Sequence, residues 1–182
     1  KWRDKSGPPI RISVNVSSRQ FREGALVDTV KRASREHGVP WENLELEITE
    51  GLLMDDLPES KVTFRELNAM GMRFSLDDFG TGYSSLNYLK RFPVRSLKID
   101  RSFIQGVIDI PDDAVLVQAI INMAHSMKLE VVAEGVETRD QLDFVRQNGC
   151  DLVQGYFFSK PIPADQFFEL MTDWRGAEMM SA

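Results

Sequence analysis

Cysteine and histidine are nearly absent from this chain, which leaves few residues for disulfides or for soft metal sites. Its 182 residues include one cysteine, Cys150, and two histidines, His37 and His125. A single cysteine excludes a disulfide within the chain and is typical of a reducing cytoplasm. Because Cys150 directly precedes a predicted strand, we expect a small core residue and not a nucleophile. Both histidines fall in predicted helices, where we expect surface or packing roles.

Long apolar runs are also absent. The most apolar helical stretch, Leu116–Ala124, is interrupted by Gln118 and Asn122, and it is too short to span a bilayer. No signal peptide is expected. The net charge of −6 argues against broad binding to nucleic-acid phosphates. It does not exclude a small phosphodiester ligand, because bound cations can reverse the local potential. We therefore expect a cytoplasmic domain with no DNA partner and no membrane span.

Six short segments read as strands that end in a polar residue, and four of them alternate between apolar and polar residues, as strands with one buried face do. In the third segment Phe74 and Leu76 share one side, and Ser75 and Asp77 share the other. The predicted strands are Ile10–Val16, Leu44–Ile48, a strand that starts at Arg73 and ends at Asp77-Asp78, Pro93–Ile99, Glu130–Glu134 and Asp151–Gln154. Each of the other five is expected to end in a polar residue that faces the same way as Asp77.

Segments with helical spacing separate most of these strands. The predicted helices are Ala25–His37, Glu59–Met70, Ser84–Leu89, Asp112–Met127, Arg139–Gln147 and Ala164–Trp174. Gly38, Gly71 and Gly149 follow three of them, where glycine commonly ends a helix, and Thr138 precedes another as an N-cap. Strands that alternate with helices predict an α/β fold with a parallel sheet. Residues 176–182 are expected to form a frayed tail.

The helical spacing also predicts which side chains pack on the sheet. In the longest helix the expected core face is Val115, Ala119, Ile120, Met123 and Met127. In the helix Glu59–Met70 the residues expected toward the sheet are Val62, Leu67 and Met70.

The polar residues at the strand ends form the candidate site, because parallel strands carry their chemistry at their carboxyl ends. The residues expected along this rim are Asn15, Glu47, Asp77, Asp78, Lys98, Glu134 and Gln154. Carboxylates with an amide and a lysine, and without histidine or cysteine, suit magnesium or manganese. For single residues a solvated Asp-Asp turn or a structural ion pair remains an alternative. Burying the whole set without a cation would cost several kcal/mol per unpaired carboxylate.

The motifs around these residues resemble those of EAL domains, a family of bacterial cyclic di-GMP phosphodiesterases. They are Ser13-Val14-Asn15-Val16-Ser17, Glu47-Ile48-Thr49-Glu50, Asp77-Asp78-Phe79-Gly80-Thr81-Gly82, Lys98-Ile99-Asp100, Glu134-Gly135-Val136-Glu137 and Gln154-Gly155-Tyr156. The resemblance extends from about Ile10 to Phe168. It implies a TIM-type (β/α)8 barrel, which usually needs about 250 residues.

Six strands would make this barrel incomplete, with about six of eight strands in a single partial domain of residues 1–182. The Glu-Ala-Leu signature of the family lies upstream of the Asn15 motif, and the sequence does not contain it. We therefore expect that residues 1–182 lack the first strands of the barrel and one metal-binding glutamate. We expect weak or no activity from these residues alone.

The resemblance also implies a role for each site residue. Two Mg²⁺ or Mn²⁺ ions would be held by Asn15, Glu47, Asp77, Asp78 and Glu134, with Asp77 as the bridge. Lys98 and Glu134 would be catalytic, and Lys98 is expected to orient the attacking water. Glu137 and Gln154 would hold substrate or metal-bound water. Glu50 is expected to steady the loop that contains Gly80, Thr81 and Gly82, and not to bind metal.

The implied reaction is hydrolysis of cyclic di-GMP to linear pGpG, with Ca²⁺ as an inhibitory ion. The alternatives are a cyclic di-GMP receptor without activity and a magnesium-dependent barrel acting on another substrate, such as an enolate. The resemblance further implies a homodimer and fusion to sensory or GGDEF domains in a parent protein with a possible membrane anchor.

Overall fold

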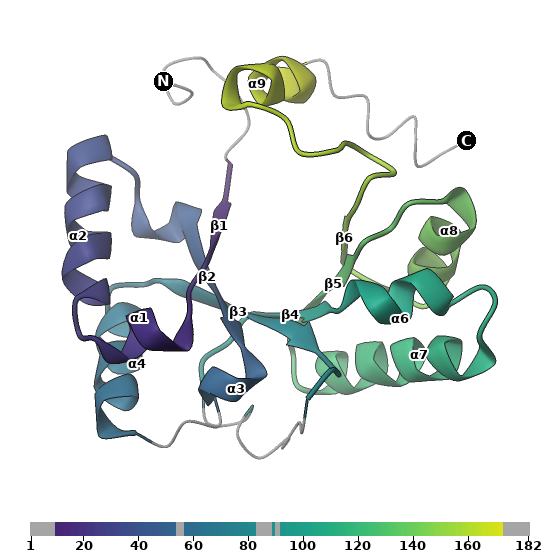
Figure 1. Cartoon of the computed structure of the whole chain (residues 1–182), viewed down its shortest axis with the longest axis horizontal. Helices are drawn as coiled ribbons and strands as arrows, with labels where there is room; N and C mark the ends of the chain where they lie inside the picture. Colours follow the sequence, from purple (N-terminus) through teal and green to yellow (C-terminus); the bar gives the residue numbers. More distant parts are fainter. Residues whose placement is uncertain (1–9, 54–56, 83–88, 90–91, 173–182) are drawn as a thin grey trace.

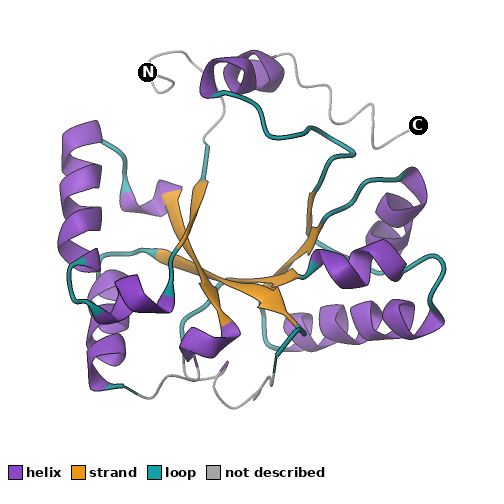
Figure 2. Ribbon diagram, viewed as in Figure 1, coloured by secondary structure: helices purple, strands orange, loops and turns teal. Residues whose placement is uncertain are grey.

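A computed structural model of the chain describes residues 10–53, 57–82, 89 and 92–172, and the account below is confined to them. Three predicted segments lie outside the described residues: the helix Ser84–Leu89 apart from Leu89, the tail 176–182 and the last two residues of the helix predicted to end at Trp174. Six parallel strands follow one another in the order β1 to β6 in a single sheet. The sheet curls around a central space, with helices on its outer side (Figures 1 and 2). The predicted α/β fold with a parallel, barrel-like sheet is confirmed.

The strand bounds differ from the predicted ones by only a few residues. The strands are β1 (Ile12–Asn15), β2 (Leu44–Thr49), β3 (Arg73–Phe79), β4 (Ser96–Ile99), β5 (Glu130–Glu134) and β6 (Leu152–Gln154). The largest difference is at β4, which begins three residues after the predicted Pro93. The register places Asn15 beside Glu47, and Glu134 beside Gln154. The predicted rim residues thus come to the same edge of the sheet.

Most of the helices lie on the outer side of the sheet (Figure 1). They are α1 (Ser18–Arg22), α2 (Leu26–His37), the 3-10 helix η1 (Trp41–Asn43), α3 (Glu50–Leu53), α4 (Pro58–Ala69), α6 (Arg101–Gly106), α7 (Pro111–Ser126), α8 (Arg139–Gln147) and α9 (Ala164–Thr172). α1, η1, α3 and α6 are short helices that the sequence spacing did not predict. α9 lies across the open side between β1 and β6 (Figure 1).

Helix ends follow the predicted caps. Gly38 ends α2 in the left-handed conformation, with φ of 61°. Thr138 begins α8 with a capping box: its hydroxyl accepts from the Gln141 N–H at 3.2 Å, and the Gln141 side chain accepts from the Thr138 N–H at 3.1 Å. Such a cap contributes about 1 kcal/mol.

The apolar core lies between the outer face of the sheet and the helices, and its largest side chains are aromatic. Phe74 of β3 stacks on Phe64 of α4 with ring centroids 4.1 Å apart, and Phe21 of α1 lies 5.4 Å from Phe64. Phe21 and Phe74 are fully buried. The apolar residues of the strands therefore point outward, and their polar residues point toward the central space.

The predicted core faces of two helices are partly wrong. In α7, Val115 is 67% exposed and Ala119 is also exposed, whereas Ile120 is buried as predicted. The buried residues of α7 are Val117, Ile120, Ile121 and Ala124. In α4, Val62 is 50% exposed, while Leu67 is buried. α7 is apolar on most of its surface, so helical spacing alone did not identify the face that meets β4 and β5.

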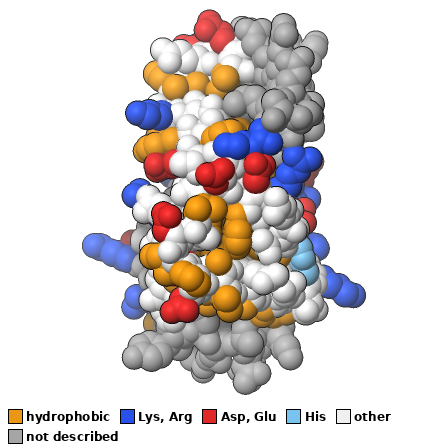
Figure 3. Space-filling view, turned by 90° about the vertical axis from the view of Figure 1, so that its right-hand side faces the viewer, with side chains coloured by type: hydrophobic (Ala, Val, Ile, Leu, Met, Phe, Trp, Pro, Cys, Tyr) orange, Lys and Arg blue, Asp and Glu red, His pale blue; other side chains and the backbone are white. Residues whose placement is uncertain are grey.

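Apolar side chains also remain on the outer surface near α6 and α7. Ile108, Ile110, Val115 and Leu116 are all more than a third exposed. Figure 3 shows apolar patches on this side of the molecule, with acidic and basic side chains between them. No helix within the described ranges is both long enough and apolar enough to cross a membrane.

The cysteine and the histidines occupy the structural positions that the sequence predicted. Cys150 packs partly buried against the core, and its thiol donates to the carbonyl of Val131 at 3.4 Å. Burial raises the pKa of Cys150 to about 11, so the thiol is unreactive near neutral pH. His37 and His125 are exposed, and His125 Nε2 lies 2.9 Å from Asp151 Oδ2, away from the rim.

Candidate metal centre

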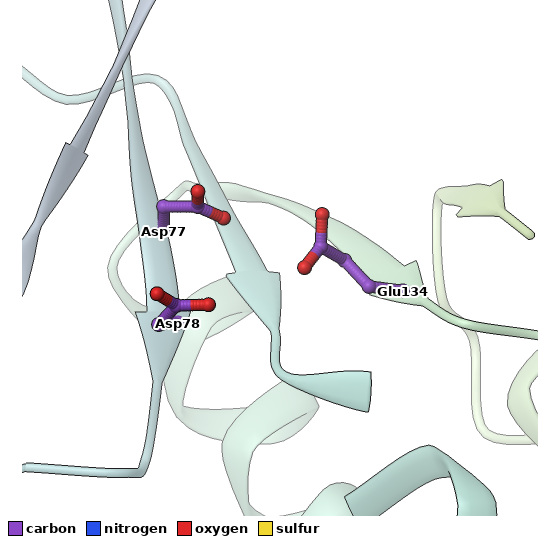
Figure 4. A group of neighbouring side chains, drawn as sticks. All are labelled: Asp77, Asp78 and Glu134. Atoms are coloured by element: carbon purple, nitrogen blue, oxygen red, sulfur yellow. The ribbon is translucent and has the colours of Figure 1, made fainter. Parts of the chain in front are cut away.

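The carboxyl end of β3 brings two aspartates into the central space. Asp77 is 9% exposed, whereas Asp78 is exposed and has a φ of 54°. A positive φ outside glycine costs about 1 kcal/mol or more. The register with β4 shifts between Leu76 and Phe79, where this irregular backbone lies. The local distortion allows the two neighbouring carboxylates to turn toward the same space, which a regular strand would prevent (Figure 4).

Glu134, at the end of β5, completes a group of three carboxylates. One oxygen from each of Asp77, Asp78 and Glu134 lies within 4.8 Å of the others. The three side chains point toward a common space (Figure 4). Three carboxylate oxygens at this spacing repel one another unless a positive charge lies among them.

Lys98 of β4 supplies such a charge. Its ammonium Nζ lies 2.9 Å from Glu47 Oε1, 3.0 Å from Asp77 Oδ1 and 2.6 Å from Glu134 Oε1. The three partners come from β2, β3 and β5, and Lys98 is only 5% exposed. Burial alone would lower the pKa of Lys98, but its hydrogen bonds to Glu134, Glu47 and Asp77 raise the pKa well above the usual lysine value. Lys98 is therefore protonated at any physiological pH.

The pKa values of two carboxyl groups in the cluster are shifted upward. Burial raises the pKa of Asp78, and the negative charges of Asp77 and Asp100 raise it further. Burial likewise raises the pKa of Glu134, although Lys98 opposes this shift. The charged form of each carboxylate is therefore less stable here than it would be in water. A bound cation would stabilise that charged form.

The donor set fits a hard divalent cation. Asp77, Asp78 and Glu134 offer several oxygens within one small space, and magnesium and manganese prefer oxygen ligands. Asp77 Oδ1 is buried, and Lys98 Nζ lies 3.0 Å from it, so a positive charge already stabilises this oxygen. Asn15 ends the exposed edge strand β1 beside Glu47, which places it at the same rim.

Glu137 and Gln154 lie beside this cluster. Together with Glu134 they line an open pocket of about 480 Å³. Arg101, Tyr156 and Lys160 line the same pocket. The pocket therefore combines carboxylates with basic groups next to the candidate metal ligands, an arrangement that suits a ligand with anionic and polar parts.

Glu50 contacts the loop that follows β3. Its Oε1 accepts a hydrogen bond from the Gly80 N–H at 2.9 Å, and the residue is 9% exposed. Thr81 Oγ1 donates to the Asp78 carbonyl at 2.9 Å. Gly80 has a φ of 99°, and an added Cβ would lie 2.8 Å from the Phe103 ring. At Gly82 an added Cβ would lie 3.0 Å from Glu50 Oε2. The loop thus rests on Glu50, which begins the short helix α3.

Two polar groups near the site were not predicted from the sequence. Asp100 begins α6 by accepting from the Ser102 N–H at 2.9 Å. Burial raises the pKa of Asp100, but the hydrogen bonds from Ser102 outweigh this and lower it. Glu45 is buried in the central space, one layer below Glu47. The alternation along β2 shows that Glu45 and Glu47 share a side, but it does not indicate what Glu45 contacts.

Comparison with known proteins identifies the family. The family model described as "EAL domain" matches residues 1–161. The chain is 45% identical over 165 residues to the bifunctional diguanylate cyclase/cyclic di-GMP phosphodiesterase MucR of Pseudomonas aeruginosa. The aligned residues cover 91% of this chain and 24% of that protein. It is also 45% identical over 166 residues to the cyclic di-GMP phosphodiesterase NbdA of the same organism, with 91% of this chain and 21% of that protein covered. The chain thus spans about a fifth to a quarter of the length of these relatives.

Solved structures agree with the sequence comparison. A structure of the PaMucR phosphodiesterase in complex with c-di-GMP matches with a TM-score of 0.86 and 44% identity, over 91% of this chain and 67% of that chain. The EAL domain of Mycobacterium smegmatis DcpA matches with a TM-score of 0.87 and 37% identity, over 94% of this chain and 77% of that chain. This chain belongs to the EAL domain family.

Proposed function

We propose that a protein containing this chain as part of its EAL domain hydrolyses cyclic di-GMP to linear pGpG with the help of Mg²⁺ or Mn²⁺. The observation that carries this proposal is the position of Lys98, whose ammonium contacts Glu47, Asp77 and Glu134 beside the group Asp77, Asp78 and Glu134. The relatives named as cyclic di-GMP phosphodiesterases support the choice of substrate.

The proposed metal ligands are the residues of the rim. Asp77, Asp78 and Glu134 would hold the ions, and Asn15 and Glu47 would complete their ligand set, with Asp77 as the shared ligand. Bound Mg²⁺ or Mn²⁺ would neutralise the phosphate oxygens and make a water molecule more acidic. Glu137 and Gln154, which line the pocket next to Glu134, would hold the phosphate or ordered water.

Lys98 is proposed to act as a hydrogen-bond donor. Its contacts with three carboxylates favour the charged ammonium, so we propose that it donates hydrogen bonds and does not take a proton from water. The group has three hydrogens to donate. It can direct one of them to the attacking water or to a phosphate oxygen, while the others remain on the carboxylates. Lys98 would therefore orient the reactants and stabilise negative charge.

The proposed function is tested by metal-dependent hydrolysis in the protein that contains residues 1–182. Mg²⁺ and Mn²⁺ should each support conversion of cyclic di-GMP to pGpG, measured by separating substrate and product. Ca²⁺ should bind but support little turnover, because its larger and looser coordination shell positions a water less well. Tight binding of cyclic di-GMP without hydrolysis in Mg²⁺ or Mn²⁺ would contradict the proposal and indicate a receptor.

Glu50→Gln should lower activity and metal affinity by about 10- to 100-fold while the domain stays folded, as found for groups that support metal ligands. The neutral amide weakens the hydrogen bond from Gly80 and so loosens the loop after Asp78. The measurement is the Mn²⁺ concentration that gives half-maximal turnover. If Glu50 itself bound a metal, the variant would instead lose one bound ion completely in a metal titration.

Residues 1–182 produced by themselves are expected to bind metal weakly and to turn over little substrate. In the described part of the chain, β1 and β6 are the two edges of the sheet, and Ile12, Val14 and Leu152 are each more than 40% exposed. Exposed strand edges with apolar side chains favour association with other chains. Sedimentation and a hydrolysis assay test this expectation. A stable monomer with an ordinary turnover rate would contradict it.

A further inference from the structure

A second layer of polar residues lies directly beneath the candidate metal centre. Residues two apart on a strand share a side, at a spacing of about 6.6 Å. Two positions before Asn15, Glu47, Asp77 and Lys98 come Ser13, Glu45, Ser75 and Ser96. The interiors of such barrels are usually filled by branched apolar side chains. Four polar residues at these positions therefore call for an explanation.

Glu45 connects this layer. Its Oε2 accepts from Ser13 Oγ and its Oε1 accepts from Ser96 Oγ, each at 3.2 Å. Ser75 Oγ lies 2.9 Å from Ser96 Oγ. A hydroxyl has one hydrogen, so when Ser96 donates to Glu45, Ser75 can donate to Ser96. Glu45 is 7% exposed, and Ser75 and Ser96 are 1% and 2% exposed.

The contacts of Glu45 reach beyond its neighbouring strands. β2 pairs with β1 and β3, yet Ser96 belongs to β4. Through its two oxygens Glu45 therefore joins β1, β2 and β4, and Ser75 adds β3. β1 is an edge strand whose residues are all exposed, and its backbone pairs with β2 alone among the described strands. The hydrogen bond from Ser13 adds a side-chain constraint to this ladder on the strand that carries Asn15.

We propose that Glu45 is a positioning residue for the metal centre: by holding Ser13 and Ser96, it fixes β1 and β4 so that Asn15 and Lys98 stand at the correct distance from Asp77. This inference rests on the proposed metal-dependent function. Metal sites require ligand positions to be held within a few tenths of an ångström, and the groups that support ligands are commonly worth 10- to 100-fold in affinity.

The test replaces Glu45 in the protein that contains residues 1–182 and measures Mn²⁺ binding directly, by electron paramagnetic resonance of free Mn²⁺. Glu45→Leu keeps a similar volume but removes both hydrogen bonds. It should raise the Mn²⁺ dissociation constant by about 10-fold or more and lower kcat. Both are measured well below the melting temperature, where a purely structural role would leave them unchanged.

Glu45→Gln should restore most of the Mn²⁺ affinity. Its amide oxygen can accept from one serine and its amide nitrogen can donate to the other, so both connections survive. Ser13→Ala removes only the connection to β1, so it should weaken Mn²⁺ binding less than Glu45→Leu does. These two conservative variants decide the question if Glu45→Leu fails to fold.

Glu130→Leu is the matched control. Glu130 lies in the same layer, beside Ser96 and on the side of β5 that carries Glu134, but its carboxylate is exposed, and in the described part of the chain it forms an ion pair with Arg11, at 4.0 Å. This variant should bind Mn²⁺ as the wild type does. Wild-type binding by Glu45→Leu, or equal losses in Glu45→Gln and Glu45→Leu, would overturn the positioning role.

The same measurements separate this inference from the proposed function. A wild-type protein that binds Mn²⁺ but does not hydrolyse cyclic di-GMP would contradict the proposed reaction, while Mn²⁺ binding by the variants would still test Glu45. A wild-type protein that binds no Mn²⁺ would overturn both.

Discussion

Asp77→Ala should remove at least about 3 kcal/mol of transition-state stabilisation, which is roughly a 150-fold loss in kcat/KM. Asp77 belongs to the carboxylate group with Asp78 and Glu134, and it also contacts Lys98. The substitution removes the proposed shared metal ligand and one of three partners of the ammonium. The assay is Mn²⁺-dependent hydrolysis of cyclic di-GMP by the protein that contains residues 1–182.

The fold of the Asp77→Ala variant should survive, because Glu47 and Glu134 still neutralise Lys98. Thermal unfolding should confirm this. Asp109→Ala is a suitable control, since Asp109 is exposed between α6 and α7 and belongs to none of the rim motifs. It should keep wild-type activity. Near wild-type turnover by Asp77→Ala would rule out the assignment of Asp77 as a metal ligand.

The sheet was predictable from the sequence because four of its strands alternate between apolar and polar residues, and the other two are apolar segments that end in a polar residue. Ser75 and Asp77 on one side of β3, and Phe74 and Leu76 on the other, identify its two faces without any tertiary information. Because parallel strands share a direction, the polar residues at their carboxyl ends come to one edge of the sheet. Alternation then indicates which of these residues share a face. Short helices were not predictable in this way. α3 spans only Glu50–Leu53, less than the length over which helical spacing can be read.

The geometry within the site was less predictable than its composition. Alternation shows that Glu47, Asp77 and Lys98 share a side, but the curl of the sheet decides that one ammonium reaches Glu47, Asp77 and Glu134 together. The positive φ of Asp78 depends on the irregular pairing of β3 with β4, which has no local sequence signal apart from the following Gly80. The hydrogen bonds of Glu45 likewise arise from contacts between strands that are distant in sequence.

Gly155→Ala should lower the free energy of unfolding by about 3 kcal/mol, because the backbone of another segment occupies the space next to Gly155. An added Cβ would lie 2.0 Å from the carbonyl oxygen and 2.4 Å from the nitrogen of Val136. Neither atom can rotate away as a side chain would. The Val136 N–H donates to the Gln154 carbonyl at 3.2 Å, and the Phe157 N–H donates to the Val136 carbonyl at 3.0 Å. To admit a methyl group, the segments after β5 and β6 must separate and weaken both bonds.

Urea unfolding measures this loss, and Gly51→Ala provides the matched control. An added Cβ at Gly51 meets nothing within 4 Å, and the residue lies within α3. Alanine is favoured over glycine inside a helix by about 0.5–1 kcal/mol, so Gly51→Ala should be neutral or slightly stabilising. Gly155→Ala should also reduce activity, since Glu134 pairs with Gln154 directly before the crowded segment and both line the pocket. Equal urea midpoints for the two variants would show that the segments after β5 and β6 can separate at little cost.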